Sequence, residues 1–347
     1  MIFFISRKMR IVSAAILFLI MPFAAVAQGK GESVKFQDYP GLGNMLARVA
    51  ISKGYCEKYG IKCSVARIST GPLGAQALVA KSIDAALIPA DVMTPAILNG
   101  SKIKIIAGGA TTIVALAVAG NHVETPNASK GYPAFMADMK GRKIGTPARG
   151  SNLERFAMAM LTKAGLKADD VTFVAVGGPD TAYGALVSKQ VDFIFLFEPA
   201  GAMCDVLKTC KVLWRAITDK EPAEIFAMNG GGTSTVVRQE MIDQQPHVVD
   251  AIINALRDAD AFFNNSANFK EVKVIAEIYN KFDFPKGDEV LERALSLQIE
   301  ARTFSVGLDR VAMTSMLKFF ADQKAIDRVL PVSDLVDPRT PNWVSKK

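Results

Sequence analysis

Polar turns that follow predicted strands carry most of the candidate chemistry of this chain. Four of these turns contain glycine and precede a helical pattern, at residues 37–43, 69–72, 149–152 and 177–180. In open α/β sheets, ligands bind beyond the carboxyl ends of the strands, where free backbone N–H groups at helix N-termini attract anions. We therefore predict one ligand site, lined by these turns and by further strand ends. Its candidate residues are Gln37, Asp38, Tyr39, Ser69, Thr70, Gly71, Asp91, Thr111, Arg149, Ser151, Asn152, Gly178 and Glu198.

The neutral side chains in these turns fit an anionic ligand. Hydroxyl and amide groups, such as those of Thr70, Ser151 and Asn152, donate hydrogen bonds to acid oxygens. Arg149 precedes a helix whose dipole would attract the same group. Ser151 has a second interpretation, because Ser151 and Glu154 have the spacing of a capping box. The turn that contains Thr70 is likewise open to a purely structural role.

Three acidic residues, Asp38, Asp91 and Glu198, lie at predicted strand ends and would suit an amine or amidine on the ligand. Carboxylates at such positions also serve as helix caps or as ion-pair partners, so both interpretations stay open. Three carboxylates on one rim would repel a small inorganic anion such as nitrate. They favour an organic anion, a sulfonate or a carboxylate, that can also carry an amine.

Motifs for catalysis and metal binding are missing from the sequence. His122 and His247 are the only histidines, and neither stands in a motif. The chain has no G-x-S-x-G elbow, no G-x4-G-K-[ST] loop, no H-E-x-x-H helix and no G-x-G-x-x-G turn after a strand. We therefore expect a binding protein rather than an enzyme, with no metal and no cofactor.

The four cysteines form two close pairs, Cys56 with Cys63 and Cys204 with Cys210. Each pair joins the end of a helical pattern to the start of a predicted strand. A metal site is the competing interpretation, but such sites need C-x2-C spacing or nearby histidines. In an oxidising compartment the spacing predicts two local disulfides.

Residues 1–27 have the pattern of a secretory signal peptide. The basic segment 7–10 precedes an apolar run from 11 to 23, and Ala25-Val26-Ala27 supplies a small-residue cleavage site. The run is short for a membrane span and contains Pro22. No cysteine lies near the cleavage site, so we expect no lipid anchor. The mature protein is expected to be free in the periplasm, as a monomer.

Charge argues against a nucleic-acid partner. The formal net charge is +7, and removing Arg7, Lys8 and Arg10 with the signal peptide leaves +4. Lysine and arginine are scattered among acidic residues rather than clustered with aromatic ones, so no nucleic-acid surface is expected. The small positive excess slightly favours an anionic ligand.

An internal repeat predicts the architecture. Residues 77–84 (ALVAKSID) recur as residues 185–192 (ALVSKQVD), and each copy lies between a strand with a Gly-rich turn and a second strand. The order strand, turn, helix, strand is a βαβ unit, which implies a parallel sheet with helices on both faces. The predicted fold class is α/β with two lobes, each a mostly parallel sheet flanked by helices.

Two chain crossings are expected to join the lobes. Residues 28–112 and 228–347 form a discontinuous lobe 1, and residues 113–227 form lobe 2. The crossings at 110–119 and 222–232, rich in Gly and Thr, form the predicted hinge. A ligand held by both lobes would close them about this hinge.

Several motifs resemble the nitrate, sulfonate and taurine type of periplasmic solute-binding proteins of ABC importers, which includes binders of thiamine-pyrimidine precursors. The resemblance covers about residues 34–227, with Ser69-Thr70-Gly71, Ile83-Asp84-Ala85, residues 140–145, Gly150-Ser151-Asn152 and Glu198-Pro199 as its most similar stretches. It implies a Venus-flytrap closure of two lobes around the ligand. Phe197-Glu198-Pro199 departs from the family's common Trp-Asp-Pro, and the longer Glu could change the size of the pocket.

The resemblance implies a protein that captures a small organic anion in the periplasm and delivers it to an inner-membrane permease. Two alternatives stay open at this point. One is a ligand-sensing protein for a membrane receptor. The other is an enzyme related to pyrimidine precursors with the same fold, which the signal peptide and the lack of histidine clusters disfavour.

Overall fold

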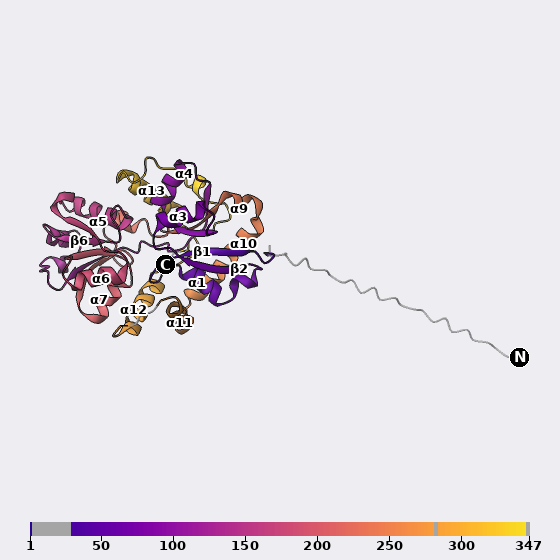
Figure 1. Ribbon diagram of the computed structural model, residues 1–347, viewed down its shortest axis with the longest axis horizontal. Helices are drawn as coiled ribbons and strands as arrows, with labels where there is room; N and C mark the ends of the chain where they lie inside the picture. The colour runs from indigo at the N-terminus through magenta and orange to yellow at the C-terminus, as the bar shows by residue number, and fades with distance from the viewer. Residues whose placement is uncertain (2–28, 281–283, 345–347) are drawn as a thin grey trace.

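Two five-stranded sheets form the framework of the computed structural model, which describes residues 1, 29–280 and 284–344. Figure 1 shows the sheets in separate lobes, one around β1 and β2 and the other around β6. All but the first residue of the predicted signal peptide lies outside the described residues, so the signal stays a prediction. No helix in the described ranges is long and apolar enough to cross a membrane.

The first sheet has the strand order β2-β1-β3-β10-β4. β1 is parallel to β2 and β3, whereas β10 is antiparallel to both of its neighbours. Because β10 follows the whole second sheet in the chain, two separate parts of the sequence build this first sheet. Its strands are β1 (Ser33–Asp38), β2 (Lys62–Arg67), β3 (Ala85–Ile88), β4 (Ile103–Ala107) and β10 (Ser234–Arg238).

The second sheet repeats the arrangement in the order β7-β6-β8-β5-β9. β6 is parallel to β7 and β8, and β5 is antiparallel to both of its neighbours. In each sheet the antiparallel strand is the first strand after a crossing from the other sheet. The predicted two-lobed α/β fold class is confirmed. The strands are β5 (Leu116–Gly120), β6 (Lys143–Thr146), β7 (Thr172–Ala175), β8 (Phe193–Leu196) and β9 (Cys210–Arg215).

Helices cover both sheets and fill the boundary between them. Around the first sheet the chain forms α1 (Met45–Ser52), α2 (Tyr55–Lys58), α3 (Gly71–Val79) and α4 (Ala90–Leu98). Around the second it forms α5 (Asn152–Lys163), α6 (Pro179–Val187), α7 (Ala200–Leu207) and α8 (Ala223–Phe226). The C-terminal third forms α9 (Gln239–Gln244), α10 (Pro246–Phe263), α11 (Phe269–Tyr279), α12 (Gly287–Glu300), α13 (Arg310–Asp322) and α14 (Val332–Leu335).

The internal repeat has a common structural cause in both lobes. The carboxylate of Asp84 accepts a hydrogen bond from the backbone N–H of Lys35, and that of Asp192 accepts one from Lys143, each at 2.9 Å. The same aspartate therefore ties the turn after the helix to the first strand of each βαβ unit. This contact requires the helix to stop sharply, and Lys81 and Lys189 end their helices at positive φ.

The two chain crossings are hydrogen-bonded to each other between the sheets. The carbonyl of Thr111 accepts from the backbone N–H groups of Gly230 and Gly232, at 2.8 and 2.9 Å. Its own N–H donates to the carbonyl of Thr303 at 2.8 Å, so a third segment after α12 joins the crossings. The predicted lobe boundaries and hinge remain a proposal.

One flank of the second lobe packs on α12. Ala202 and Met203 of α7 belong to the same buried core as Leu291 and Leu295 of α12. Figure 1 shows α12 between α7 and α11. The other flank packs on α13, where the rings of Phe319 and Phe320 lie 5.3 and 5.9 Å from the ring of Phe156 on α5. The lobes are therefore in contact on both flanks.

Both predicted disulfides are confirmed. Cys56 in α2 bonds to Cys63 in β2, and Cys204 in α7 bonds to Cys210 at the start of β9. The Cα atoms of the two pairs lie 5.9 and 4.9 Å apart.

Replacing both cysteines of either pair with serine should lower the free energy of unfolding by about 2–3 kcal/mol, the loop-closure entropy of a short disulfide loop. Urea denaturation of the two double variants measures the loss. Unchanged midpoints in protein that thiol titration shows to be fully oxidised would contradict this expectation.

Candidate functional site

A narrow cleft lies between the lobes. The cavity within it has a volume of only about 30 Å³, so the walls of the cleft lie close together in this structure. Both crossings form its floor, and its walls come from the start of α4, the first turns of α5, and α13. The lining residues are Pro89, Thr112, Ile113, Val114, Ala115, Asn152, Leu153, Phe156, Gly232, Thr233, Met316 and Phe320.

The α5 wall carries an unpaired cation. Ser151 starts this helix, since its Oγ accepts a hydrogen bond from the N–H of Glu154 at 3.3 Å. The helix then places Asn152, Arg155 and Phe156 on one face, because residues three and four apart are neighbours. Asn152 and Phe156 line the cleft. The Nε of Arg155 is buried and has no hydrogen-bond partner among the described residues.

The α4 wall carries an unpaired anion. Asp91 stands in the first turn of α4, where the helix dipole favours a negative charge. Its Oδ1 is buried without a hydrogen-bond partner among the described residues, and so is Oγ1 of Thr94, three residues along the same face. Burial raises the pKa of Asp91 to about 6, and the charge of Arg155 acts in the opposite direction. Asp91 and Arg155 therefore interact across the lobes, although no salt bridge joins them.

A buried arginine shapes the loop between β1 and α1. Arg48 is completely buried, and its guanidinium binds both carboxylate oxygens of Asp38, at 2.9 and 3.0 Å. It also donates to the carbonyls of Tyr39 and Gly41, each at 2.9 Å. Gly41 has φ +67, and a Cβ there would lie 3.4 Å from Pro199 of the other lobe. Arg48 therefore holds the loop that meets lobe 2.

The side chain of Gln37 ties three chain segments together beneath this loop. Its amide donates to the carbonyls of Ile68 and Thr70, and its oxygen accepts from the N–H of Leu87 at 3.1 Å. Tyr39 donates to the carbonyl of Leu87 at 2.8 Å, and burial raises the pKa of its hydroxyl. A Cβ on Gly71 would lie 3.4 Å from that hydroxyl. In this conformation Gln37 and Tyr39 therefore hold the end of β1 against the segments that contain Thr70 and Leu87.

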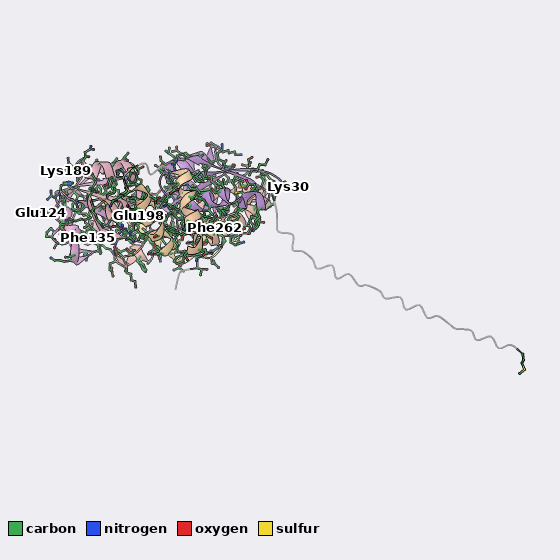
Figure 2. All side chains as sticks on the ribbon, turned by 90° about the horizontal axis from the view of Figure 1, so that it is seen from below. Lys30, Glu124, Phe135, Lys189, Glu198 and Phe262 are labelled. Atoms are coloured by element: carbon green, nitrogen blue, oxygen red, sulfur yellow. A yellow bond between two sulfur atoms is a disulfide. The ribbon has the colours of Figure 1, made fainter. Side chains whose placement is uncertain are left out.

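Two of the three predicted acidic ligands are corrected. Asp38 is neutralised by Arg48 and by Arg67, whose NH1 lies 3.3 Å from its Oδ2. Glu198 is buried, pairs with Arg215 at 3.0 Å and accepts from the N–H of Ala202 at 2.8 Å. Burial raises the pKa of Glu198, and Arg215 opposes this. Neither carboxylate is free for a cation on the ligand. Figure 2 shows Glu198 midway between the two ends of the molecule.

Four further predicted site residues have structural contacts within the protein. Oγ1 of Thr70 accepts from the N–H of Leu73 as the cap of α3, so its helix-capping interpretation and that of Ser151 hold. Thr111 is fully buried in the crossing. Arg149 pairs with Glu154 at 3.0 Å. A capping hydroxyl accepts a hydrogen bond and keeps its own O–H for donation, so ligand binding by these side chains stays a prediction.

Of the predicted residues, Asn152 lines the cleft. Asp91 lies beside it at the start of α4, and its Oδ1 has no hydrogen-bond partner among the described residues. Ser69 is exposed beside α3, and Gly178 precedes α6 with open space at its Cα. The sequence analysis missed Arg155, although its spacing of three from Asn152 could have indicated it. It also missed Thr94 and the α13 wall, which no local pattern connects to the cleft.

The lining residues of the cleft offer hydrogen-bonding groups, and the charged side chains of Asp91 and Arg155 stand beside it, on the same first turns of α4 and α5 as the lining residues Pro89 and Asn152. No histidine or cysteine lines it. His122 and His247 pair with Asp192 and Glu32 elsewhere in the protein. The described ranges contain no group of three or more His, Cys, Asp or Glu side chains placed to hold a metal ion.

A profile of the NMT1-like family matches residues 42–277, more than half of the chain. This chain belongs to the NMT1-like family. The matched region runs from the loop that Arg48 holds, through the whole second lobe, to α11. It therefore contains both the α4 and the α5 walls of the cleft.

This NMT1-like protein is 29% identical over 221 residues to a Brucella abortus (strain 2308) protein named only as a binding protein. The match spans 63% of this chain and 63% of that relative. The alkanesulfonate-binding protein SsuA from Xanthomonas axonopodis pv. citri, solved with MOPS bound, has the same fold, with a TM-score of 0.66 at 17% identity. That match covers 89% of this chain and 99% of the other. The desulfurization enzyme DszB also shares the fold, with a TM-score of 0.58 at 14% identity over 89% and 97% of the two chains.

Replacing Arg48 with Met should cost about 3–5 kcal/mol of unfolding free energy, because it leaves the buried Asp38 with only the half-exposed Arg67. Adding Asp38→Asn in the same chain should recover part of the loss, since no buried charge is then unpaired. Urea denaturation measures both variants. A single variant as stable as the wild type would show that the pair does not hold the loop.

Proposed function

We propose that this protein is the periplasmic substrate-binding component of an ABC importer. It captures a small organic anion, a sulfonate or a carboxylate that can also carry an amine, between two closing lobes. It then delivers this ligand to a permease in the inner membrane. The protein acts as a monomer, without metal, cofactor or covalent chemistry.

The observation that carries the proposal is the guanidinium of Arg155 beside the cleft, three residues along α5 from Asn152, which lines it. It stands in the first turns of α5, where the helix N-terminus adds its own positive partial charge. Its Nε lacks a protein partner, and the neighbouring Asn152 offers a neutral donor. A cation and a donor with no protein acceptor suit one acid group of a ligand.

Comparison supports the transport role. The fold is shared with an alkanesulfonate-binding protein, and a curated relative is named as a binding protein. The signal pattern at the N-terminus supports export to the periplasm. The shared fold of a desulfurization enzyme makes hydrolysis the competing activity. The lining of the cleft, which has no histidine or cysteine, favours binding.

Isothermal titration calorimetry against sulfonates, carboxylates and pyrimidines tests the ligand class. The Asn152→Ala variant should bind the best ligand about 1–3 kcal/mol more weakly, the value of a hydrogen bond to a charged group. Ser151→Ala is the matched control, since it removes a helix cap and should lower stability by about 1 kcal/mol with little effect on affinity. Selective binding of an uncharged sugar or a peptide would refute the assignment.

Ligand should close the lobes, because Asp91 and Arg155 stand on opposite walls and a ligand can satisfy both only when the walls meet. Small-angle scattering with and without the ligand found by calorimetry should show a smaller radius of gyration in the complex. An unchanged radius despite tight binding would count against closure.

A further inference from the structure

Asp91 differs from the other two carboxylates near the cleft. Asp38 is neutralised by Arg48 and Arg67, and Glu198 by Arg215. Asp91 has no such partner: its Oδ1 is buried and unbonded among the described residues. Asp91 is therefore the one of these three carboxylates that forms no salt bridge, and it lies close enough to Arg155 to feel its charge.

A buried carboxylate oxygen without a hydrogen bond is unfavourable, because burial removes its hydration; here only the backbone N–H groups of Asp91 and Val92 and the charge of Arg155 favour the charged form. The same burial raises the pKa of Asp91 to about 6, so the group is mostly ionised at pH 7.5. Asparagine has almost the same shape and would avoid the penalty of a charge. A local cost of this kind is expected at functional sites, so we consider the effect of Asp91 on the ligand.

The position of Asp91 determines what that effect is. Any acid group that binds Arg155 comes within the field of the Asp91 carboxylate. An anion with acceptor oxygens only, such as sulfate, would be repelled by Asp91 and could not bond to its Oδ1. A ligand that has an N–H or O–H donor beside its acid group would satisfy both side chains.

We propose that Asp91 is the charge-selecting residue of the cleft, which excludes acceptor-only anions from Arg155 and admits acids that bring a hydrogen-bond donor. This inference rests on the proposed function, because it assumes that Arg155 binds the acid group. The selectivity of the cleft is thereby assigned to one residue. The ligand class consists of singly charged acids that carry a hydrogen-bond donor next to the acid group.

The test uses inorganic sulfate as the probe, so it does not depend on knowing the natural ligand. At pH 7.5 the wild-type protein should show no sulfate binding by calorimetry up to millimolar concentrations. Asp91→Asn should bind sulfate about tenfold more tightly, because it removes the repulsion between the Asp91 carboxylate and the anion; a tenfold change corresponds to about 1.4 kcal/mol. Asp91→Asn combined with Arg155→Met should abolish this binding. Glu289→Gln, which removes an exposed carboxylate from the first turn of α12, is the control and should behave as wild type.

A second measurement needs no variant. The ionisable groups that face Asp91 are Arg155 on α5 and the hydroxyl of Tyr39, whose pKa burial raises further from neutrality. Asp91 is therefore the group here that titrates near pH 6, and lowering the pH to 5 should make the wild type bind sulfate. Sulfate keeps its double charge over this range.

Stability provides an independent readout. The folded state raises the pKa of Asp91, so ionisation destabilises the fold above about pH 6 and not below the ordinary value near 4. Asp91→Asn should therefore melt a few degrees higher than wild type at pH 7.5, and the difference should shrink at pH 4.5. A folded variant that gains no sulfate binding, together with a wild type that gains none at pH 5, would overturn the selective role. Equal sulfate binding by wild type and variant at pH 7.5 would overturn it too. Neither result would affect the organic-ligand titration that tests the proposed function.

Discussion

The buried ion pair between Arg48 and Asp38 is the constraint on which the site depends. A guanidinium has five donors in a fixed fork, and here it binds both carboxylate oxygens and the carbonyls of Tyr39 and Gly41. An arginine without solvent contact is tolerable only if its hydrogen bonds are satisfied in this way. The pair therefore fixes the shape of the loop after β1, and it uses up the carboxylate at the end of that strand.

In the second lobe, a carboxylate at a strand end is also neutralised by an arginine. Glu198, at the end of β8, is neutralised by Arg215 on β9. Arg215 also contacts Asp205 at 2.8 Å, and Asp205 accepts from Arg293 of α12 at 2.9 Å. This chain of charges links the two lobes beside the apolar contact between α7 and α12. These four charged side chains on that flank therefore all have partners within the protein.

The fold was largely predictable because its determinants are local. The repeat around Asp84 and Asp192 sets one βαβ unit in each lobe, and close cysteine pairs can reach only each other. The role of a strand-end carboxylate is different, because its partner can come from anywhere in the chain. Arg48 lies ten residues after Asp38 inside a helix, and nothing in that spacing shows that its side chain returns to the strand end.

The cation at the cleft was missed for a related reason. Helix periodicity alone could have indicated Arg155, because it lies three residues after Asn152, which is a predicted site residue. That it would lie opposite Asp91 depends on how α5 and α4 meet across two lobes, and this follows from the packing of α12 and α13. Long-range packing of that kind leaves no periodic signal in the sequence.

In the lobe closure that we propose, the two flanks of the cleft differ in the free energy that closing requires. On the α7 flank, closing the lobes buries apolar side chains and charges that already have partners. On the α4 and α5 flank, closing them removes water from Asp91 and Arg155 without giving either a protein partner. Closure on that side is thus unfavourable until another molecule supplies a donor and an acceptor. A ligand that does so contributes its hydrogen bonds only in the closed state. The resulting difference in affinity between the open and closed states shifts the equilibrium toward closure. The unpaired groups that weaken the closed protein are, on this argument, the same groups that make its closure depend on the ligand.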